Sequence, residues 1–334
     1  MKIIVDNAIP YIKDRFPEKV EVMYVPGKEF TPEMIKDADA LIVRTRTKCN
    51  GDLLAGSSVK LIFTATIGTD HIDIPWCEKN GIIVKNAPGC NAPGVAQYLF
   101  SSLFKTGFDP EKHVLGIIGY GNVGQIVADW ANAMEIKTLI SDPPRQEHGW
   151  KDVEYFDLDY ILKNSDAVTL HVPLTNEGKY PTYKLIGEKE IGMMKPGAVL
   201  VNSSRGGVVD EKALKGALIE NKLKAILDVW ENEPNIDVEL VGLVSIATPH
   251  IAGYSEEGKK RATRMALEDM SAILGVNTEI KGLECRAPEN KKITRKLIED
   301  SYNPFEDDKN LRENLSRFEE LRNQYSYRHE PFFI

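Results

Sequence analysis

A glycine-rich turn in the middle of the chain constrains the fold more than any other feature. Gly119, Gly121 and Gly124 follow the apolar run 114–118, which is typical of a buried strand. After the glycines, apolar residues recur at helical spacing, and a second short strand is predicted at 137–140. Together these segments predict a βαβ unit of about 30 residues, in which the glycines let backbone N–H groups approach a pyrophosphate at a helix N-terminus.

The acidic residue that such a dinucleotide site needs is also present. Asp142 ends the second strand, near the usual offset of about 20 residues from the glycines. Its carboxylate can accept hydrogen bonds from the adenosine ribose, and its charge would repel a 2′-phosphate, so the pattern favours NAD over NADP. The alternative is an ordinary glycine turn, and the register of strand, helix and acid makes it the less favoured interpretation.

Composition restricts the compartment and the partners. The 334 residues suffice for two domains plus a tail, and no apolar stretch approaches the roughly 20 residues that cross a bilayer. The four cysteines are scattered without CxxC spacing, so we expect no metal site and no disulfide framework, and the cytoplasm is the simplest location. A net charge of −8 argues against nucleic acid as a partner, whereas a small anionic substrate needs only a local cluster of positive charge.

Apolar, β-branched runs alternate with helical patterns along most of the chain, which predicts an α/β fold with two doubly wound parallel sheets. The expected strands are 3–5, 22–25, 40–43, 61–64, 82–84, 114–118, 138–140, 167–170, 198–201, 225–227 and 244–247. Helices are expected at 95–104 and from Glu256 to about Leu274.

The mid-chain position of the glycines predicts that the NAD-binding domain is an insertion. We expect a flavodoxin-like substrate domain at 1–92 and 253–279, and a Rossmann domain at 93–252. Residues 280–334 differ in composition and are predicted to form a small C-terminal appendage. Its apolar stripe suits either a helix packed on its own subunit or a dimerisation surface. The stripe comprises Leu311, Leu315, Phe318, Leu321 and Tyr325.

Candidate catalytic side chains follow strands of the predicted Rossmann sheet. Arg205, Asp228 and His250 come at or just after carboxyl ends of strands, and Glu233 lies in the loop after Asp228. Ligands bind at this edge of open parallel sheets. Each residue could instead be structural, for example a surface ion pair or a satisfied core histidine, but all four fall on the edge that also carries the glycines.

These side chains suit hydride transfer from a 2-hydroxy acid. His250 can take the hydroxyl proton, and a neighbouring carboxylate, Glu233, would hold its tautomer. Arg205 can bind a substrate carboxylate bidentately and polarise the adjacent C–O group. Asp228 is placed to reach the nicotinamide.

A second polar cluster is predicted in the first domain. The strand at 40–43 runs directly into Arg44, Thr45 and Arg46, and the next strand runs into a loop that contains Thr66. Cations interleaved with hydroxyls suit a carboxylate or a phosphate.

Four segments of the chain resemble the D-isomer-specific 2-hydroxyacid dehydrogenase family. They are TATIGTDHID, LHVPLT, NSSRGGVVD, and DVWENEP followed by ATPHIAGYS. Further segments narrow the resemblance to the branch that oxidises 4-phospho-D-erythronate with NAD in vitamin B6 biosynthesis. They are VDNAIPY, NAPGCNA, SDPPR, HIAGYSEEGK and the tail from YNPFEDD onward.

The resemblance implies a role for individual residues. It implies that the catalytic residues are Arg205, Glu233 and His250. It also implies that the substrate is contacted by Thr45, Thr66 and Tyr254. The implied NAD contacts are Asn122, Val123, Asp142, Ser203, Ser204, Asp228 and Gly253.

The same resemblance implies a homodimer formed through the tail. Arg328 and His329 are candidates for a neighbouring subunit's phosphate site. Another 2-hydroxyacid dehydrogenase, such as one acting on 3-phosphoglycerate, and a non-enzymatic NAD-sensing scaffold are the alternatives.

Overall fold

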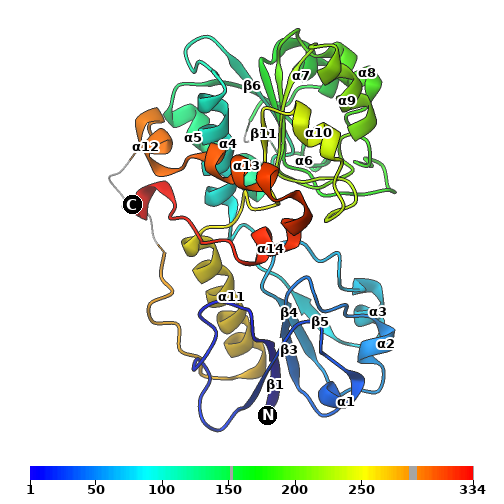
Figure 1. Ribbon diagram of the computed structural model, residues 1–334. Helices are drawn as coiled ribbons and strands as arrows, with labels where there is room; N and C mark the ends of the chain where they lie inside the picture. The colour runs from blue at the N-terminus through cyan, green and yellow to red at the C-terminus, as the bar shows by residue number, and fades with distance from the viewer. Residues whose placement is uncertain (151–152, 286–291, 334) are drawn as a thin grey trace. The chain divides into compact units, whose positions relative to one another are not determined.

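The computed structural model describes residues 1–150, 153–285 and 292–333 (Figure 1). Its contacts divide the chain into two compact units. The first unit comprises Met1–Asn91 and Ser255–Ala287, and the second comprises Ala92–Tyr254 and Pro288–Ile334. Within the described residues, no helix has the length and apolar character that a membrane span requires.

The first unit is built on a five-stranded parallel sheet. Its strand order is β2-β1-β3-β4-β5, which is the flavodoxin-like order. The strands are β1 (Lys2–Asp6), β2 (Glu21–Val25), β3 (Ala40–Val43), β4 (Leu61–Thr64) and β5 (Ile83–Lys85). The predicted flavodoxin-like α/β architecture is therefore confirmed.

Successive strand residues of this sheet face opposite helical layers, as the two-residue period of a strand requires. Ile3 and Val5 are buried with residues of α11 (Glu256–Leu274), whereas Ile4 is buried on the other face. That second face is covered by α1 (Pro32–Ile35), α2 (Gly51–Leu54) and α3 (Ile74–Lys79). Figure 1 shows α11 on one side of the strands and the shorter helices on the other.

The second unit is built on a six-stranded parallel sheet with the order β11-β10-β9-β8-β6-β7. A single parallel bridge between Ile140 and Tyr155 extends it beyond β7 and gives the strand order of a Rossmann sheet. The order reverses between β6 and β8, so the carboxyl ends there form the switch point where ligands bind. The strands are β6 (Val114–Ile118), β7 (Lys137–Ser141), β8 (Ala167–Leu170), β9 (Val199–Asn202), β10 (Lys224–Leu227) and β11 (Ile246–Ala247).

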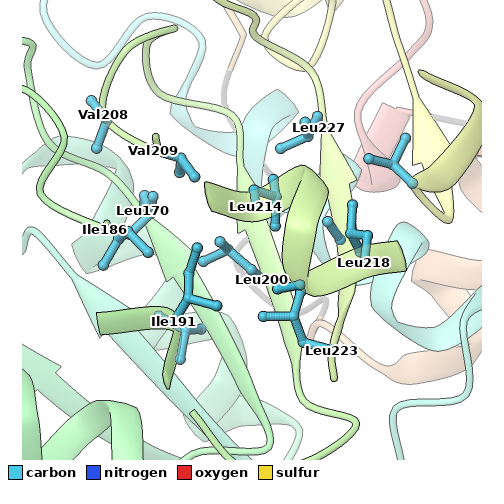
Figure 2. Close-up of a cluster of buried hydrophobic side chains, with 14 of the residues drawn as sticks. Leu170, Ile186, Ile191, Leu200, Val208, Val209, Leu214, Leu218, Leu223 and Leu227 are labelled. Carbon is cyan, nitrogen blue, oxygen red and sulfur yellow. The ribbon is translucent and has the colours of Figure 1, made fainter. Parts of the chain in front are cut away.

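Helices cover both faces of the second sheet. On one face lie α4 (Ala92–Lys105), α5 (Asn122–Ala133) and α12 (Arg295–Ser301). On the other lie α7 (Leu158–Asn164), α8 (Glu188–Met193), α9 (Glu211–Ile219) and α10 (Val238–Leu243). Figure 2 shows this second core, in which Leu214 and Leu218 of α9 face Leu200 of β9. The short α6 (Pro143–Glu147) follows β7.

The C-terminal segment packs on the second unit of its own chain. Leu311 and Phe318, two members of the predicted apolar stripe, are buried in the core that contains α9 and α10. Asp308 accepts a hydrogen bond from the backbone N–H of Ala247 at 2.7 Å, which covers the edge strand β11. The segment comprises α13 (Pro304–Glu313), η1 (Leu315–Arg317), α14 (Phe318–Asn323) and η2 (Pro331–Phe333). Leu311 and Phe318 therefore pack on their own chain, and dimerisation through this segment stays a prediction.

Candidate active site

The glycine turn between β6 and α5 has the geometry of a dinucleotide cradle. Gly119 has a φ of +92°, and a Cβ there would lie 2.5 Å from the carbonyl oxygen of His171. A Cβ on Gly124 would lie 2.1 Å from the carbonyl oxygen of Gly119, so only glycine permits this close packing. A Cβ on Gly121, in contrast, would meet nothing within 4 Å. The space over Gly121, at the N-terminus of α5, therefore fits a pyrophosphate.

Asp142 is held beside this turn. Its carboxylate accepts hydrogen bonds from the backbone N–H groups of Tyr120 at 2.7 Å and Arg145 at 3.0 Å. The Arg145 guanidinium donates to the carbonyl oxygen of Tyr120 and stacks on the ring of Trp150, with 3.8 Å between its Cζ and the ring centroid. Sequence reasoning did not single out Arg145, although it stands in the quoted SDPPR segment.

Because the space over Gly121 is open, a side chain added there should weaken NADH binding without destabilising the fold. In a Gly121→Ala variant, we expect NADH affinity to fall about tenfold or more, because the methyl group occupies the space proposed for the pyrophosphate. Its melting temperature should stay close to that of the unaltered protein. NADH fluorescence titration and thermal unfolding measure the two effects. Gly192→Ala is the matched control, since a Cβ there also meets nothing within 4 Å; equal NADH affinity in both variants would contradict the assignment.

Glu233 and His250 form a close acid–base pair in the second unit. Nδ1 of His250 lies 2.9 Å from Oε2 of Glu233 and 3.2 Å from Oε1. Glu233 also accepts the backbone N–H of Trp230 at 3.0 Å, which fixes the carboxylate in its loop. Burial raises the pKa of the Glu233 carboxyl, but the hydrogen bond and charge of His250, with the charge of Arg322, outweigh burial and bring the pKa below its ordinary value.

Asp228 organises the loop that carries His250. Its side chain is buried, and its carboxylate accepts hydrogen bonds from Thr248 Oγ1 at 2.6 Å and from the backbone N–H groups of Ile251 at 2.7 Å and Ala252 at 2.9 Å. The φ of His250 is +59°, a conformation that costs a non-glycine residue free energy and that these bonds help to hold. Sequence reasoning assigned Asp228 to the nicotinamide and missed this role.

The loop after β9 approaches the loop after β10 very closely at Gly206. A Cβ on Gly206 would lie 1.9 Å from the carbonyl oxygen of Trp230. The preceding residue, Arg205, is ordered by a hydrogen bond from its Nη1 to the carbonyl oxygen of Ser204 at 2.8 Å. Glycine at 206 therefore brings the Arg205 loop against the loop that contains Glu233.

The two serines before Arg205 differ in their hydrogen bonds. Ser204 Oγ donates to Asn202 Oδ1 at 2.8 Å. Ser203 Oγ is buried and has no hydrogen-bond partner among the residues that the structure describes. A buried hydroxyl of this kind calls for an explanation, and a bound ligand group would supply one.

The predicted substrate residues of the first unit lie at adjacent strand ends. Arg44, Thr45 and Arg46 follow β3, and Thr66 follows the neighbouring parallel strand β4. Nε of Arg44 is 3.1 Å from Oδ2 of the buried Asp6, which fixes the orientation of the guanidinium. Thr66 Oγ1 is 3.0 Å from the carbonyl oxygen of Gly68, to which it donates.

Two arginines of the C-terminal segment contact the loop around Tyr254, and sequence reasoning placed neither of them there. Nε of Arg322 donates to the Tyr254 hydroxyl at 3.3 Å. Arg328 donates to the carbonyl oxygens of Ile251 at 3.1 Å and Tyr254 at 3.2 Å, and also to that of Ala252. In this chain the guanidinium of Arg328 bonds to carbonyl groups of its own 251–254 loop, and a role in a neighbouring subunit stays a prediction.

Comparison with known proteins gives one consistent family. Residues 97–252 match the model of the D-isomer specific 2-hydroxyacid dehydrogenase, NAD binding domain. An erythronate-4-phosphate dehydrogenase of Bacteroides fragilis is 46% identical to this chain, and the alignment covers 99% of this chain and 97% of that protein.

Many solved structures share the fold, among them two dehydrogenases with bound NAD. D-lactate dehydrogenase of Aquifex aeolicus, complexed with NAD and lactic acid, is 27% identical with a TM-score of 0.66 and covers 84% of this chain and 99% of its own. The NAD⁺-bound 3-phosphoglycerate dehydrogenase of Entamoeba histolytica is 29% identical with a TM-score of 0.66, over 84% of this chain and 97% of its own.

Proposed function

We propose, from the premise that this chain belongs to the D-isomer specific 2-hydroxyacid dehydrogenase family and is an NAD-dependent dehydrogenase, that its substrate is 4-phospho-D-erythronate. The product is 2-oxo-3-hydroxy-4-phosphobutanoate, and the reaction serves vitamin B6 biosynthesis. The observation that carries the chemistry is the Glu233–His250 pair, with 2.9 Å between Oε2 and Nδ1. Such a pair is the usual arrangement of a general base and the carboxylate that orients it.

Each side chain of the pair has a defined part in the reaction. Because Nδ1 of His250 faces Glu233, the base is the other ring nitrogen, Nε2, which takes the proton from the C2 hydroxyl as the C–H bond breaks. Glu233 holds this tautomer and stabilises the imidazolium that forms. NAD, when bound, accepts the hydride from C2, so the alcohol is oxidised to a ketone and the cofactor is reduced.

The NAD site that we propose consists of residues from the glycine turn and the loops next to it. The pyrophosphate would be held at the start of α5 by Gly121, Asn122 and Val123. The carboxylate of Asp142 would accept hydrogen bonds from the ribose hydroxyls. The buried hydroxyl of Ser203, which has no hydrogen-bond partner among the described residues, would form a further hydrogen bond with NAD. The remaining contacts proposed are Gly119, Gly124, Ser204, Asp228 and Gly253.

Positive side chains are assigned to the two anionic groups of the substrate. Arg205 would bind the carboxylate next to C2 and polarise the developing carbonyl. Arg44 and Arg46 would bind the phosphate, with Thr45, Thr66 and Tyr254 as hydrogen-bonding partners. The orientation that Asp6 gives to Arg44 supports this assignment, because a fixed guanidinium loses less entropy on binding an anion.

A parallel assay of NADH formation with 4-phosphoerythronate, 3-phosphoglycerate and D-lactate tests the substrate. We expect 4-phosphoerythronate to give the highest kcat/KM. An Arg44→Gln, Arg46→Gln double variant should raise KM for it about tenfold or more, since charge-assisted bonds to phosphate are lost. The effect on D-lactate should be small. Preference for either other acid would replace the substrate assignment, and NADH binding without turnover of any acid would favour a sensing scaffold.

The assembly and the location are further parts of the proposal. We propose a homodimer formed through residues 280–334, of which 286–291 and 334 lie outside the described residues, and a cytoplasmic location. Cys49, Cys77, Cys90 and Cys285 form no disulfide within the described residues, and thiols of this kind are typical of a reducing compartment.

A further inference from the structure

Arg322 of α14 reaches the candidate catalytic pair. Its Nη1 lies 3.6 Å from Oε2 of Glu233, the same oxygen that lies 2.9 Å from Nδ1 of His250. Its Nε donates to the hydroxyl of Tyr254. One guanidinium therefore joins the carboxylate that orients the proposed base to a tyrosine proposed to contact the substrate.

This ion pair differs from those on the surface of the protein. The side chain of Arg322 is 23% exposed and that of Glu233 is 18% exposed. The interaction between two charges is stronger when water is largely excluded, whereas exposed pairs contribute little. The nearby pair between Arg317 and Glu320 is of the exposed kind, with 51% and 41% of the two side chains accessible.

The C-terminal segment is anchored on both sides of Arg322. Phe318, at the start of α14, is buried in the core of the second unit. The ring of Tyr325 packs edge-on against Tyr254, with 6.1 Å between centroids, and Arg328 bonds to carbonyl groups of the 251–254 loop. Arg322 is thus held in place by packing and hydrogen bonds.

We propose that Arg322 is a positioning residue of the acid–base pair, which keeps Glu233 ionised and turned toward His250 and holds the Tyr254 hydroxyl beside it. The inference rests on the proposed function, because it assigns Arg322 to the same reaction. Arg322 acts through Glu233 and Tyr254 and not on the reacting carbon. By this arrangement the C-terminal segment contributes to catalysis within its own chain.

The charges around Glu233 explain why a cation is needed there. Besides His250 and Arg322, Glu211 of α9 lies close enough to Glu233 for the charge of Glu233 to act on its carboxyl group. Burial raises the pKa of Glu211 to about 7, and the charges of nearby carboxylates, Glu233 included, add to the rise. Asp228 also lies near enough to interact with the Arg322 charge. Removing the guanidinium would take away one of the positive charges that lower the pKa of Glu233, so that pKa would rise.

Steady-state kinetics of Arg322→Gln and Arg322→Lys test the proposal. With glutamine, we expect kcat to fall about tenfold, because Glu233 and Tyr254 lose the guanidinium that positions them, while KM for NAD changes less than twofold. The acidic limb of the pH profile of kcat/KM should move to higher pH. Lysine, which keeps the charge, should restore most of the loss, and Arg317→Gln should behave as the unaltered enzyme.

A measurement that needs no turnover separates this proposal from the proposed function. The titration of the Glu233 carboxyl can be followed by NMR in protein labelled with ¹³C at the glutamate carboxyl, with the signal assigned by its loss in Glu233→Gln. In Arg322→Gln its midpoint should rise, and in Arg322→Lys it should rise less.

The outcomes are distinct. An unshifted Glu233 midpoint, or a fall in kcat without movement of the acidic limb, would overturn the role of Arg322. An unaltered enzyme that oxidises no 2-hydroxy acid would instead overturn the proposed function, while the NMR titration would still decide whether Arg322 acts on Glu233. If Arg322→Gln unfolds at the assay temperature, Arg322→Lys and the unaltered protein provide the comparison.

Discussion

Replacing His250 with glutamine is expected to reduce NADH formation by roughly 10²- to 10⁴-fold, the range that a positioned general base contributes. Glutamine can fill the place of the ring and accept a hydrogen bond, but it cannot take up the hydroxyl proton at neutral pH. Because His250 follows β11 and lies outside the glycine turn, the affinity for NADH should change little. Stopped-flow absorbance at saturating NAD and substrate measures the loss, and fluorescence titration measures the affinity.

The partner of His250 provides the comparison for this result. Glu233→Gln keeps the shape of the carboxylate and one oxygen acceptor but removes the charge that stabilises the imidazolium. We expect a smaller fall in kcat than for His250→Gln, and the double variant should be little worse than His250→Gln alone, since the two residues act as a unit. Turnover by His250→Gln at the rate of the unaltered enzyme would rule out the acid–base assignment.

Much of the fold could be predicted because parallel strands that are buried on both faces have short, nearly continuous apolar sequences. The segments 3–5, 40–43 and 61–64 were recognised in this way, and each corresponds to an observed strand. The strand predicted at 244–247 starts two residues before the observed strand β11, which begins at Ile246. Val244 is equally apolar, but its N–H completes α10 by bonding to the carbonyl oxygen of Leu240 at 3.2 Å, so the strand begins only at Ile246.

The site was predictable only where strand ends determine it. Glu233 and His250 meet because the loops after β10 and β11 leave neighbouring strands at the same edge of the sheet. Arg322 could not be placed in this way, because the sequence of the tail shows only an apolar stripe. The position that a charged side chain of such a helix reaches depends on how the helix packs against the rest of the chain. The role of Asp228 in the His250 loop was missed for a similar reason, since its partners are backbone N–H groups whose direction the sequence does not specify.

One methyl group added at Gly206 should damage both structure and activity. A Cβ there would lie 1.9 Å from the carbonyl oxygen of Trp230, 2.5 Å from its carbonyl carbon and 3.1 Å from the backbone nitrogen of Glu231. These are backbone atoms and cannot rotate away as a flexible side chain can. In Gly206→Ala, one of the two loops must therefore move, and with it either Arg205 or the loop that carries Glu233.

We expect Gly206→Ala to lower the free energy of unfolding by about 2–3 kcal/mol, the cost typical of overpacking a close contact. The fall in kcat/KM should be about 100-fold, because displacement of a catalytic group by about 1 Å has effects of that size. Chemical denaturation and steady-state assays below the melting temperature measure the two. Gly216→Ala, in the interior of α9, is the control, because a Cβ there meets nothing within 4 Å and alanine favours the helix. If Gly206→Ala matched Gly216→Ala in stability and turnover, the close approach of these loops would not be what aligns Arg205 with the acid–base pair.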